Sequence, residues 1–431
     1  MKVWRLRVLV ASGLIALVVL AVIVFHAALL GAAISFGGRA AGYNVRYDRL
    51  SFKGGHLEMA RPAVASLRGE PIFSAERIAV DYSLRDAFGG PYLFGVHAVD
   101  IVRPRITIVH HRDGTYNVTL PAASKNANAK PFAVPRVHLS IEDGSAGIID
   151  ETRIYAHSRR LAIERFQLDA RLVPTGLSTF TLALAIAEEG GKYPLTARGT
   201  FDETRGYEVG RLRGRTLALG PLVDYALNST SLHVAGGVLN DIDARVYGLV
   251  DRHGTMRRHV GVTANLDHFQ PYLGGITKPL RDGRGALRVY DDGLAIPKVD
   301  GSIAGVPVRI AGGIYNLAKP TLRLGITGRG PLSRLLTLSD AGKKLALDGA
   351  MAFSLLVEGD ATQPTTLAAF SSPRLTYGNI PLEGTNGLVA LSGPETAILH
   401  AGLTYDGIAA GARGRIILQK HTDVELVAGV D

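Results

Sequence analysis

Regular alternation of apolar and polar residues is the feature that most constrains the fold of this chain. Leu182, Leu184 and Ile186 are separated by small residues, and Leu322, Leu324 and Ile326 follow the same pattern. Successive side chains of a β-strand point to opposite faces of the sheet, so each run has one apolar face and one polar or small face. The sequence therefore predicts a mainly β protein.

Turn signals separate the alternating runs. Asp-Gly pairs, which favour tight turns between antiparallel strands, recur at Asp113-Gly114, Asp143-Gly144, Asp282-Gly283, Asp292-Gly293 and Asp406-Gly407. Short helices are predicted at Tyr82–Phe88, Leu222–Leu227, Leu266–Leu273 and Leu332–Leu338. None of these helices is long enough to bury a core by itself. We expect a long, curved antiparallel β-sheet with a few short helices.

The apolar face of such a sheet has to be hidden from water. Two sheets packed face to face would do this and form a closed core. Aromatic residues make up only 7% of the chain, whereas Gly and aliphatic residues are frequent, which also suits a curved sheet that holds an apolar, chain-like ligand. We predict that the following residues line such a groove: Ile106, Ile108, Leu182, Leu184, Ile186, Val308, Ile310, Leu322, Leu324 and Ile326.

A second strong signal is an apolar segment near the N-terminus. Residues 8–38 contain no Asp, Glu, Lys or Arg. A helix needs about 20 such residues to cross a hydrocarbon core of roughly 30 Å. We therefore expect residues 1–38 to be a cytoplasmic tail followed by a transmembrane signal anchor. The expected span includes Val8, Leu14, Leu20, Phe25 and Leu30.

The flanking charges predict the orientation of this anchor. Lys2, Arg5 and Arg7 precede the span, and cytoplasmic flanks carry the excess of Lys and Arg. The N-terminus is therefore expected in the cytoplasm and the bulk of the chain in the periplasm, with a single pass through the inner membrane. A cleaved signal peptide is the alternative, because Gly31-Ala32-Ala33 provides small residues, but signal h-regions are usually only about 7–15 residues long.

Composition excludes several classes of protein and site. The chain has no Cys, so disulfides, thiolate metal sites and Cys nucleophiles are excluded. The net charge of +10 is dispersed among apolar residues, as in Arg211-Leu212-Arg213, and no nucleic-acid module is recognisable. We expect no nucleic-acid partner. The dispersed positive charge has two interpretations. It belongs either to a solvated face of the sheet or to a surface that attracts anionic lipid headgroups.

Catalytic motifs are not recognisable in the sequence. It contains no Gly-x-Ser-x-Gly elbow, His-Glu-x-x-His pair or phosphate-binding loop. The best metal candidate is His110-His111-Arg112-Asp113, but neighbouring residues of a regular strand face opposite ways, so the two histidines could not both ligate one ion. The alternative interpretation is a hairpin end with solvated histidines. We expect neither an enzyme nor a cofactor or metal site.

The order of motifs in the first part of the chain resembles the TamB/AsmA-like family of bacterial envelope proteins. The resemblance begins with the N-terminal anchor and continues through short motifs at residues 42–45, 50–57, 69–78, 82–86, 99–106 and 113–117. Later segments resemble the body of that family more loosely, for example residues 301–313. The resemblance implies a β-taco, a half-pipe of strands lined by aliphatic side chains. It places an AsmA-like β domain at residues 39–123 and a repetitive β-groove at residues 131–431.

The same resemblance implies a function. Members of the family are implicated in moving phospholipid between the inner and outer membranes, and the TamB branch is linked to outer-membrane barrel proteins. We therefore expect a membrane-anchored, bridge-like lipid transfer protein for outer-membrane biogenesis, with phospholipid as its partner. The alternative is a scaffold for outer-membrane protein assembly that pairs with a β-barrel protein. The C-terminal domain of the TamB branch is not recognisable here, so we also expect either a short member or a fragment.

Overall fold

A computed structural model describes most of the chain outside its N-terminal segment. The described residues are 38–87, 95–118, 136–174, 176–188, 191–202, 207–227, 232–250, 256–273, 278–316, 319–338, 345–418 and 422–430. They are mainly β, and hydrogen bonding assigns 25 strands to one sheet. The chain divides into two compact units, Met1–Glu208 and Val209–Asp431, which we describe separately as unit 1 and unit 2.

The strands of unit 1 are short at first and longer after residue 136. They are β1 (Tyr43–Arg46), β2 (Arg49–Lys53), β3 (His56–Ala60), β4 (Ala63–Ser66), β5 (Pro71–Ser74), β6 (Arg77–Tyr82), β7 (Val96–Val102), β8 (Arg105–His110), β9 (Val137–Asp150), β10 (Arg160–Leu172), β11 (Ser178–Glu188) and β12 (Gly191–Asp202). Its short helices are α2 (Leu84–Ala87) and the 3₁₀ turn η2 (Ala156–Arg159).

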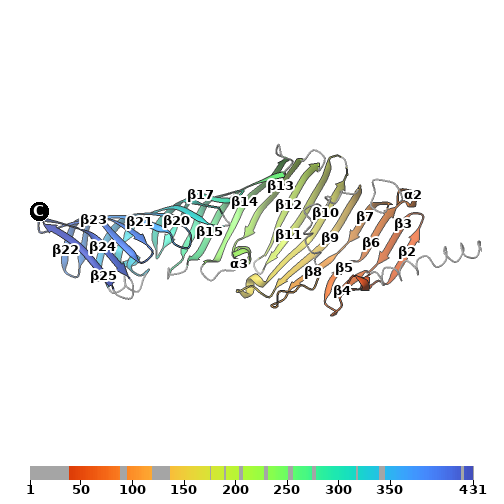
Figure 1. Ribbon diagram of the computed structural model, residues 1–431, viewed down its shortest axis with the longest axis horizontal. Coiled ribbons are helices and arrows are strands. Elements are labelled where there is room, and N and C mark those ends of the chain that lie inside the picture. Colours follow the sequence, from red (N-terminus) through yellow and green to blue (C-terminus); the bar gives the residue numbers. More distant parts are fainter. Residues whose placement is uncertain are drawn as a thin grey trace, which may run out of the picture. The chain divides into compact units, whose positions relative to one another are not determined.

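In unit 1 two tiers of short strands meet on the long strand β9 (Figure 1). One tier runs β2, β3, β6, β7, and β7 pairs in parallel with the first half of β9. The other tier runs β1, β4, β5, β8, and β8 pairs in parallel with the second half. From β9 onward the strands continue antiparallel through β10, β11 and β12. The prediction of a mainly β chain with a long antiparallel sheet is confirmed, and these two parallel pairs are exceptions to it.

A line of backbone irregularities marks the boundary between the two tiers. Arg61 and Arg103, each between two short strands, have φ of 49° and 47°, and Asp143 and Arg165, inside β9 and β10, have φ of 50° and 51°. The N–H of Arg61 donates to the carbonyl of Glu76 at 2.8 Å, so adjoining strands remain hydrogen-bonded through this line. Bulges bend the strands that contain them. Because these positions lie in neighbouring strands, the sheet of unit 1 bends along one line.

Unit 2 is an antiparallel meander of longer strands. Most of β13 (Tyr207–Ala218) belongs to it. The strands that follow are β14 (Leu232–Val250), β15 (Met256–Leu273), β16 (Leu280–Tyr290), β17 (Gly293–Ile303), β18 (Val306–Tyr315), β19 (Thr321–Pro331), β20 (Leu347–Asp360), β21 (Thr365–Tyr377), β22 (Ile380–Ser392), β23 (Glu395–Tyr405), β24 (Ile408–Leu418) and β25 (Thr422–Val430). Its helices are α3 (Gly220–Leu227) and α4 (Leu332–Leu336).

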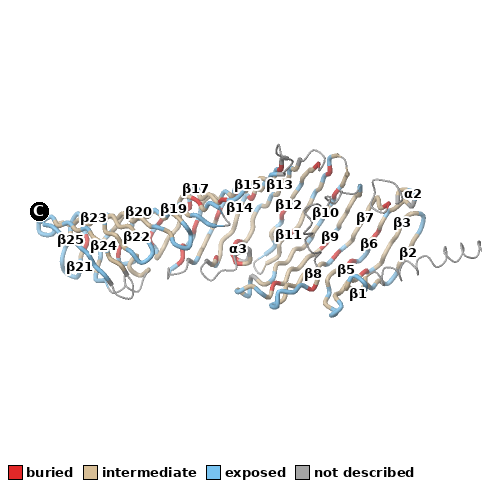
Figure 2. The backbone as a smooth tube through the Cα atoms, viewed as in Figure 1, coloured by how far each residue is buried: buried red, intermediate tan, exposed pale blue. Residues whose placement is uncertain are grey.

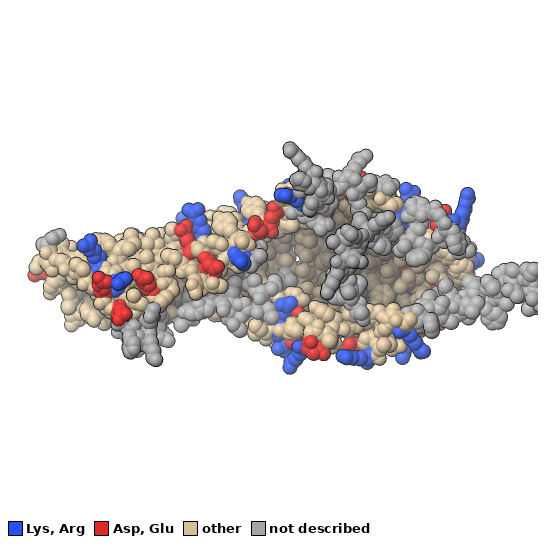
Figure 3. All heavy atoms as spheres, in the orientation of Figure 1, with Lys and Arg blue, Asp and Glu red and all other residues tan. Residues whose placement is uncertain are grey.

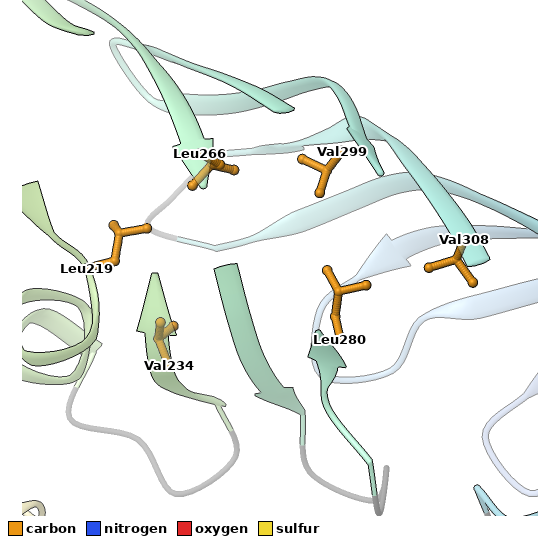
Figure 4. Packing of buried hydrophobic residues seen from close by; sticks show 6 residues of the cluster. All are labelled: Leu219, Val234, Leu266, Leu280, Val299 and Val308. Carbon is orange, nitrogen blue, oxygen red and sulfur yellow. The ribbon is translucent and has the colours of Figure 1, made fainter. Parts of the chain in front are cut away.

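The core of unit 2 is a cluster of buried aliphatic side chains. Figure 4 shows Leu266 and Val299 on one side of a shared space, with Val234 and Leu280 on the other. Leu219, just before α3, and Val308 complete the buried set. Side chains that approach from two sides close off the space between them. This part of the apolar face is therefore packed against itself.

The sequence predictions of local structure are partly confirmed. Helices form at α2, α3 and α4, as expected. The helix predicted at Leu266–Leu273 is wrong, because these residues belong to β15. Asp143-Gly144 and Asp282-Gly283 are not turns: each lies inside a strand, where Asp143 and Asp282 have φ of 50° and 51°. An Asp that tolerates positive φ forms a bulge as readily as it forms a turn.

The predicted membrane anchor lies outside the described residues, apart from its last residue. This includes Val8, Leu14, Leu20, Phe25 and Leu30. Within the part of the chain that the structure describes, none of the helices has the length and hydropathy needed to span a bilayer. The predicted boundary between residues 39–123 and 131–431 does not interrupt the sheet, since β7 and β8 both pair with β9.

Candidate functional site

The strand register of unit 1 gathers large apolar side chains on one face of its sheet. Residues directly opposite each other in paired strands share a face. One row across the strands consists of Leu50, Met59, Ile78, Ile101, Ile141, Leu168, Leu182 and Ala197. A second row consists of Val45, Val64, Phe73, Ile106, Ala146, Ile163, Ile186 and Tyr193. We call this side of unit 1 the aliphatic face.

Five of the ten predicted groove residues lie on the aliphatic face. Ile106 and Ile108 are in β8, opposite Ala146 and Ile148 of β9. The other three, in β11, are Leu182, Leu184 and Ile186. The alternating pattern therefore identified both the strands and the face that they share.

Few large side chains of the aliphatic face are packed into a closed interior. Among the described residues of unit 1, the buried hydrophobic ones are four alanines and Leu195. The large side chains of its two rows are only partly buried, and Figure 2 shows the strands of this unit mostly in the intermediate class. In Figure 3 unit 1 is hollowed, and no Lys, Arg, Asp or Glu is visible on the floor of the hollow. A partly exposed, continuous apolar face of this kind is a candidate binding surface.

The opposite face of the unit 1 sheet is polar. Nδ1 of His56 lies 2.5 Å from a carboxylate oxygen of Asp81 on the neighbouring strand. His138 and Asp169 form a similar cross-strand pair at 2.8 Å. These side chains are exposed, so such pairs contribute little to stability. They show that the face opposite the aliphatic face is in contact with water.

A polar cluster borders the aliphatic face at the ends of β8 and β9. Asp150 is 2% exposed and lies 3.0 Å from Nδ1 of His110. It accepts hydrogen bonds from both the N–H and the hydroxyl of Thr152 and from Nε of Arg153, at 2.6–3.0 Å. Burial raises the pKa of Asp150, but these hydrogen bonds outweigh it and hold the pKa below its usual value. The ring of Tyr116 stacks on His110, with centroids 4.3 Å apart.

The opposite end of the face is also bordered by polar groups. Tyr82 follows Val80 on the aliphatic face of β6, and its ring lies 5.2 Å from that of Phe52. Burial raises the pKa of the Tyr82 hydroxyl. Nε2 of His97 lies 2.9 Å from a carboxylate oxygen of Asp86 in α2. The aliphatic face is thus an apolar strip between two polar borders.

The remaining predicted groove residues lie in unit 2 and are arranged differently. Val308 is 4% exposed and belongs to the buried cluster, and Ile310 and Ile326 pack against that cluster. Leu322 and Leu324 are partly buried on the same face of β19. These five side chains share one apolar face, but here part of that face is a packed core.

Glycines explain why unit 2 packs more closely. A Cβ on Gly328 would lie 2.6 Å from the ring of Phe353, and a Cβ on Gly330 would lie 2.8 Å from Val306. A Cβ on Gly312, whose φ is +138°, would collide with the carbonyl oxygen of Arg323. Side chains and neighbouring backbone therefore occupy the space above these glycines. Gly is frequent in the sequence, but only the strand register places these glycines on the apolar face.

The histidines have partners that fit a structural role. His110 faces Asp150, whereas Nε2 of His111 lies 3.4 Å from Glu70 and its Nδ1 lies 3.9 Å from Glu151. The two histidines thus face different carboxylates, as alternation predicts, although the buried Nε2 of His111 makes no hydrogen bond among the described residues. Within either unit taken alone, the described residues hold no group of three side chains placed to ligate one metal ion.

In comparisons with known proteins, no family model matches the chain, and no curated protein matches it. The resemblance to the TamB/AsmA-like family is therefore carried by the motifs of the sequence alone.

Proposed function

We propose that this protein holds phospholipid by its acyl chains on the aliphatic face of unit 1 and transfers it between the inner and outer membranes. The observation that carries the proposal is the continuity of that face across neighbouring strands, from β2 to β12. A globular core would bury these side chains, whereas they are only partly buried here. An apolar ligand is what such a surface requires.

The dimensions of the strip suit an acyl chain. Along β7 and β8 the apolar positions extend from Val99 to Ile108, which at roughly 3.3 Å per residue is about 30 Å. The hydrocarbon core of a bilayer, which is two acyl chains thick, is also about 30 Å, so the strip is longer than one acyl chain requires. Burial of each CH₂ contributes about 0.8 kcal/mol, so even partial coverage of a chain is a large effect. The polar borders leave the headgroup at the water-exposed margin.

Membrane attachment is part of the same proposal. The apolar segment within residues 1–38 would anchor the chain in the inner membrane, with its bulk in the periplasm. A tethered carrier needs neither a catalytic group nor a cofactor, because transfer along a surface requires only an apolar lining. The aliphatic face then works as a conduit of the β-taco type, with phospholipid as the cargo.

Lipid retention by the purified full chain tests the proposal. The protein is extracted in detergent, and its bound lipids are identified by mass spectrometry. Leu182→Asp places a charge on the aliphatic face, whereas Thr181→Asp places one on the opposite face of the same strand. We expect phospholipid with the wild type and with Thr181→Asp, and a loss of most of it with Leu182→Asp. Equal retention by both variants would contradict the proposal.

A second candidate function rests on β25 in unit 2. This strand pairs with β24, and its large apolar residues Val424, Leu426, Val427 and Val430 are 51–69% exposed. An exposed apolar strand can add a strand from another protein to its sheet. The second candidate is therefore an assembly scaffold for outer-membrane β-barrel proteins. Photo-crosslinking from Val427 that captures a barrel protein, in a chain that retains no lipid, would favour it over the conduit.

A further inference from the structure

Glu188 is an acidic residue on the aliphatic face of unit 1. It ends β11, two residues after Ile186 and four after Leu184, so its side chain shares their face. Ile186 is opposite Ile163 of β10, which places Glu188 beside Leu161. The next strand contributes Ile148, which is opposite Leu161. A carboxyl group thus ends a row of aliphatic side chains at the border of the strip.

The Glu188 carboxyl group lacks the partners that a buried acid normally has. Its Oε1 is buried and has no hydrogen-bond partner among the described residues. Burial raises the pKa of Glu188, an effect that the nearby His157 partly offsets. Asp150, at the same border, accepts hydrogen bonds from Thr152 and Arg153. The contrast identifies Glu188 as the acid of this border with an unfilled hydrogen-bonding position.

We propose that Glu188 receives the primary ammonium group of a phosphoethanolamine headgroup whose acyl chains lie on the aliphatic face. This inference rests on the proposed function, because the acyl chains bring the headgroup to the border. An unfilled carboxylate oxygen next to apolar side chains calls for a ligand that carries both a hydrogen-bond donor and a positive charge. A lipid headgroup with these two properties, joined to apolar chains, matches both parts of the site.

The chemistry of Glu188 discriminates among headgroups. A primary ammonium group donates hydrogen bonds to the carboxylate and neutralises its charge. A quaternary ammonium group, as in phosphocholine, has no N–H to donate, so Oε1 would stay unsatisfied. A phosphoglycerol headgroup carries a net negative charge and would be repelled by the carboxylate. The site should therefore prefer phosphoethanolamine over both.

Competition between headgroups in one vesicle preparation tests the inference. The full chain in detergent is exchanged against vesicles of equal parts phosphatidylethanolamine, phosphatidylcholine and phosphatidylglycerol, and the retained lipids are measured by mass spectrometry. We expect the wild type to enrich phosphatidylethanolamine about five-fold over phosphatidylcholine, as a charge-assisted hydrogen bond allows. Glu188→Gln should lower this ratio to near one, with total lipid retained.

Controls separate this inference from the proposed function. Glu164→Gln removes a carboxylate from the opposite face of β10, where Glu164 pairs with Lys192, and should keep the headgroup preference. If the wild type and Glu188→Gln retain lipid with the same headgroup ratio, the inference is wrong and the conduit stands. If neither retains phospholipid, the proposed function itself fails. Loss of preference in Glu164→Gln as well would also overturn the assignment to Glu188.

Discussion

The strands of unit 1 and unit 2 have the same alternation of apolar and polar residues, but the apolar side chains are buried to different extents in the two units. In unit 1 the face is built from large side chains on each strand, such as Met59, Ile78 and Leu182, and these stay partly buried. In unit 2 glycines alternate with large residues on the apolar face, and Val306 and Val308 are 0% and 4% exposed. The comparison teaches that the small residues of an apolar face decide whether it stays open or packs on itself.

The physical reason is the space above each glycine. Without a Cβ at Gly328 the ring of Phe353 can lie over the backbone, and Gly330 admits Val306 in the same way. Close packing fills the volume that an acyl chain would need. The proposed lipid binding therefore concerns unit 1, and the buried cluster of unit 2 contributes mainly to stability.

The largest expected effect comes from a charge placed on each apolar face. Val308→Asp buries an unpaired carboxylate in the core of unit 2 and should destabilise the protein by about 4 kcal/mol. Leu182→Asp, on the open face of unit 1, should cost only about 1 kcal/mol, because water can reach the new carboxylate. Chemical denaturation of the two variants measures both effects. Equal destabilisation by the two substitutions would contradict the claim that the apolar face is open in unit 1 and packed in unit 2.

A glycine substitution should have the next largest effect. Gly312→Ala forces a Cβ against the carbonyl oxygen of Arg323 at a φ of +138°, and should destabilise unit 2 by about 3 kcal/mol. Gly261→Ala is the matched control in β15, because its Cβ would meet no atom within 4 Å. The control should change stability by less than about 1 kcal/mol. Thermal unfolding compares the two, and a harmless Gly312→Ala would mean that the glycines do not determine the packing.

Removing a phenylalanine ring from each apolar face compares how tightly the two faces are packed. Phe353→Ala uncovers Gly328 and leaves a cavity beside the unit 2 core, which should cost about 3 kcal/mol. Phe180→Ala, on the aliphatic face of β11, should cost about 1 kcal/mol. Phe353→Ala should also increase the amount of lipid retained, because space opens in unit 2. Unchanged lipid content in a folded variant would show that this space does not limit binding.

The smallest expected effect on stability comes from an ion pair on the polar face of unit 2. It tests whether residues outside the apolar faces contribute little to the difference between the units. Hydrogen bonds from Arg211, at 2.6 and 2.7 Å, lower the pKa of Asp243 from 3.8 to about 2. Because the pKa of Asp243 is lower in the folded state than in the unfolded state, its ionised form stabilises the fold at pH values above the unfolded-state pKa. This stabilisation is lost as the pH falls through the folded-state pKa. Asp243→Asn should therefore be less stable than the wild type at pH 5, with the difference shrinking towards pH 2. Denaturation midpoints at the two pH values measure it, and a constant difference would contradict the pairing.

Sequence patterns predicted the strands and their faces because side-chain alternation is a local property. Ile106, Ile108 and Ile186 were placed on one face before their pairing was known, and the register puts them there. The parallel pairing of β7 and β8 with β9 was missed, since it depends on a connection whose path the sequence does not encode locally. Asp143-Gly144 was read as a turn, because the same residues serve turns and bulges.

The candidate site was only half predictable. Alternation indicated an apolar strip, but its openness in unit 1 and closure in unit 2 depend on which residues meet across strands. Gly328 faces Phe353 only because of the β19–β20 register. The sequence pattern assigned no functional role to Glu188, and only its place in β11 beside Leu161 gives it a position on the strip.

Site-specific photo-crosslinking in intact cells is the most direct test of the central claim. A photoreactive amino acid is placed at Leu182 on the aliphatic face or at Thr181 on the polar face of the same strand. The account predicts adducts with phospholipid from position 182 and none from position 181. Equal adduct yields from the two positions, or no lipid adduct from position 182 in a folded protein, would contradict it.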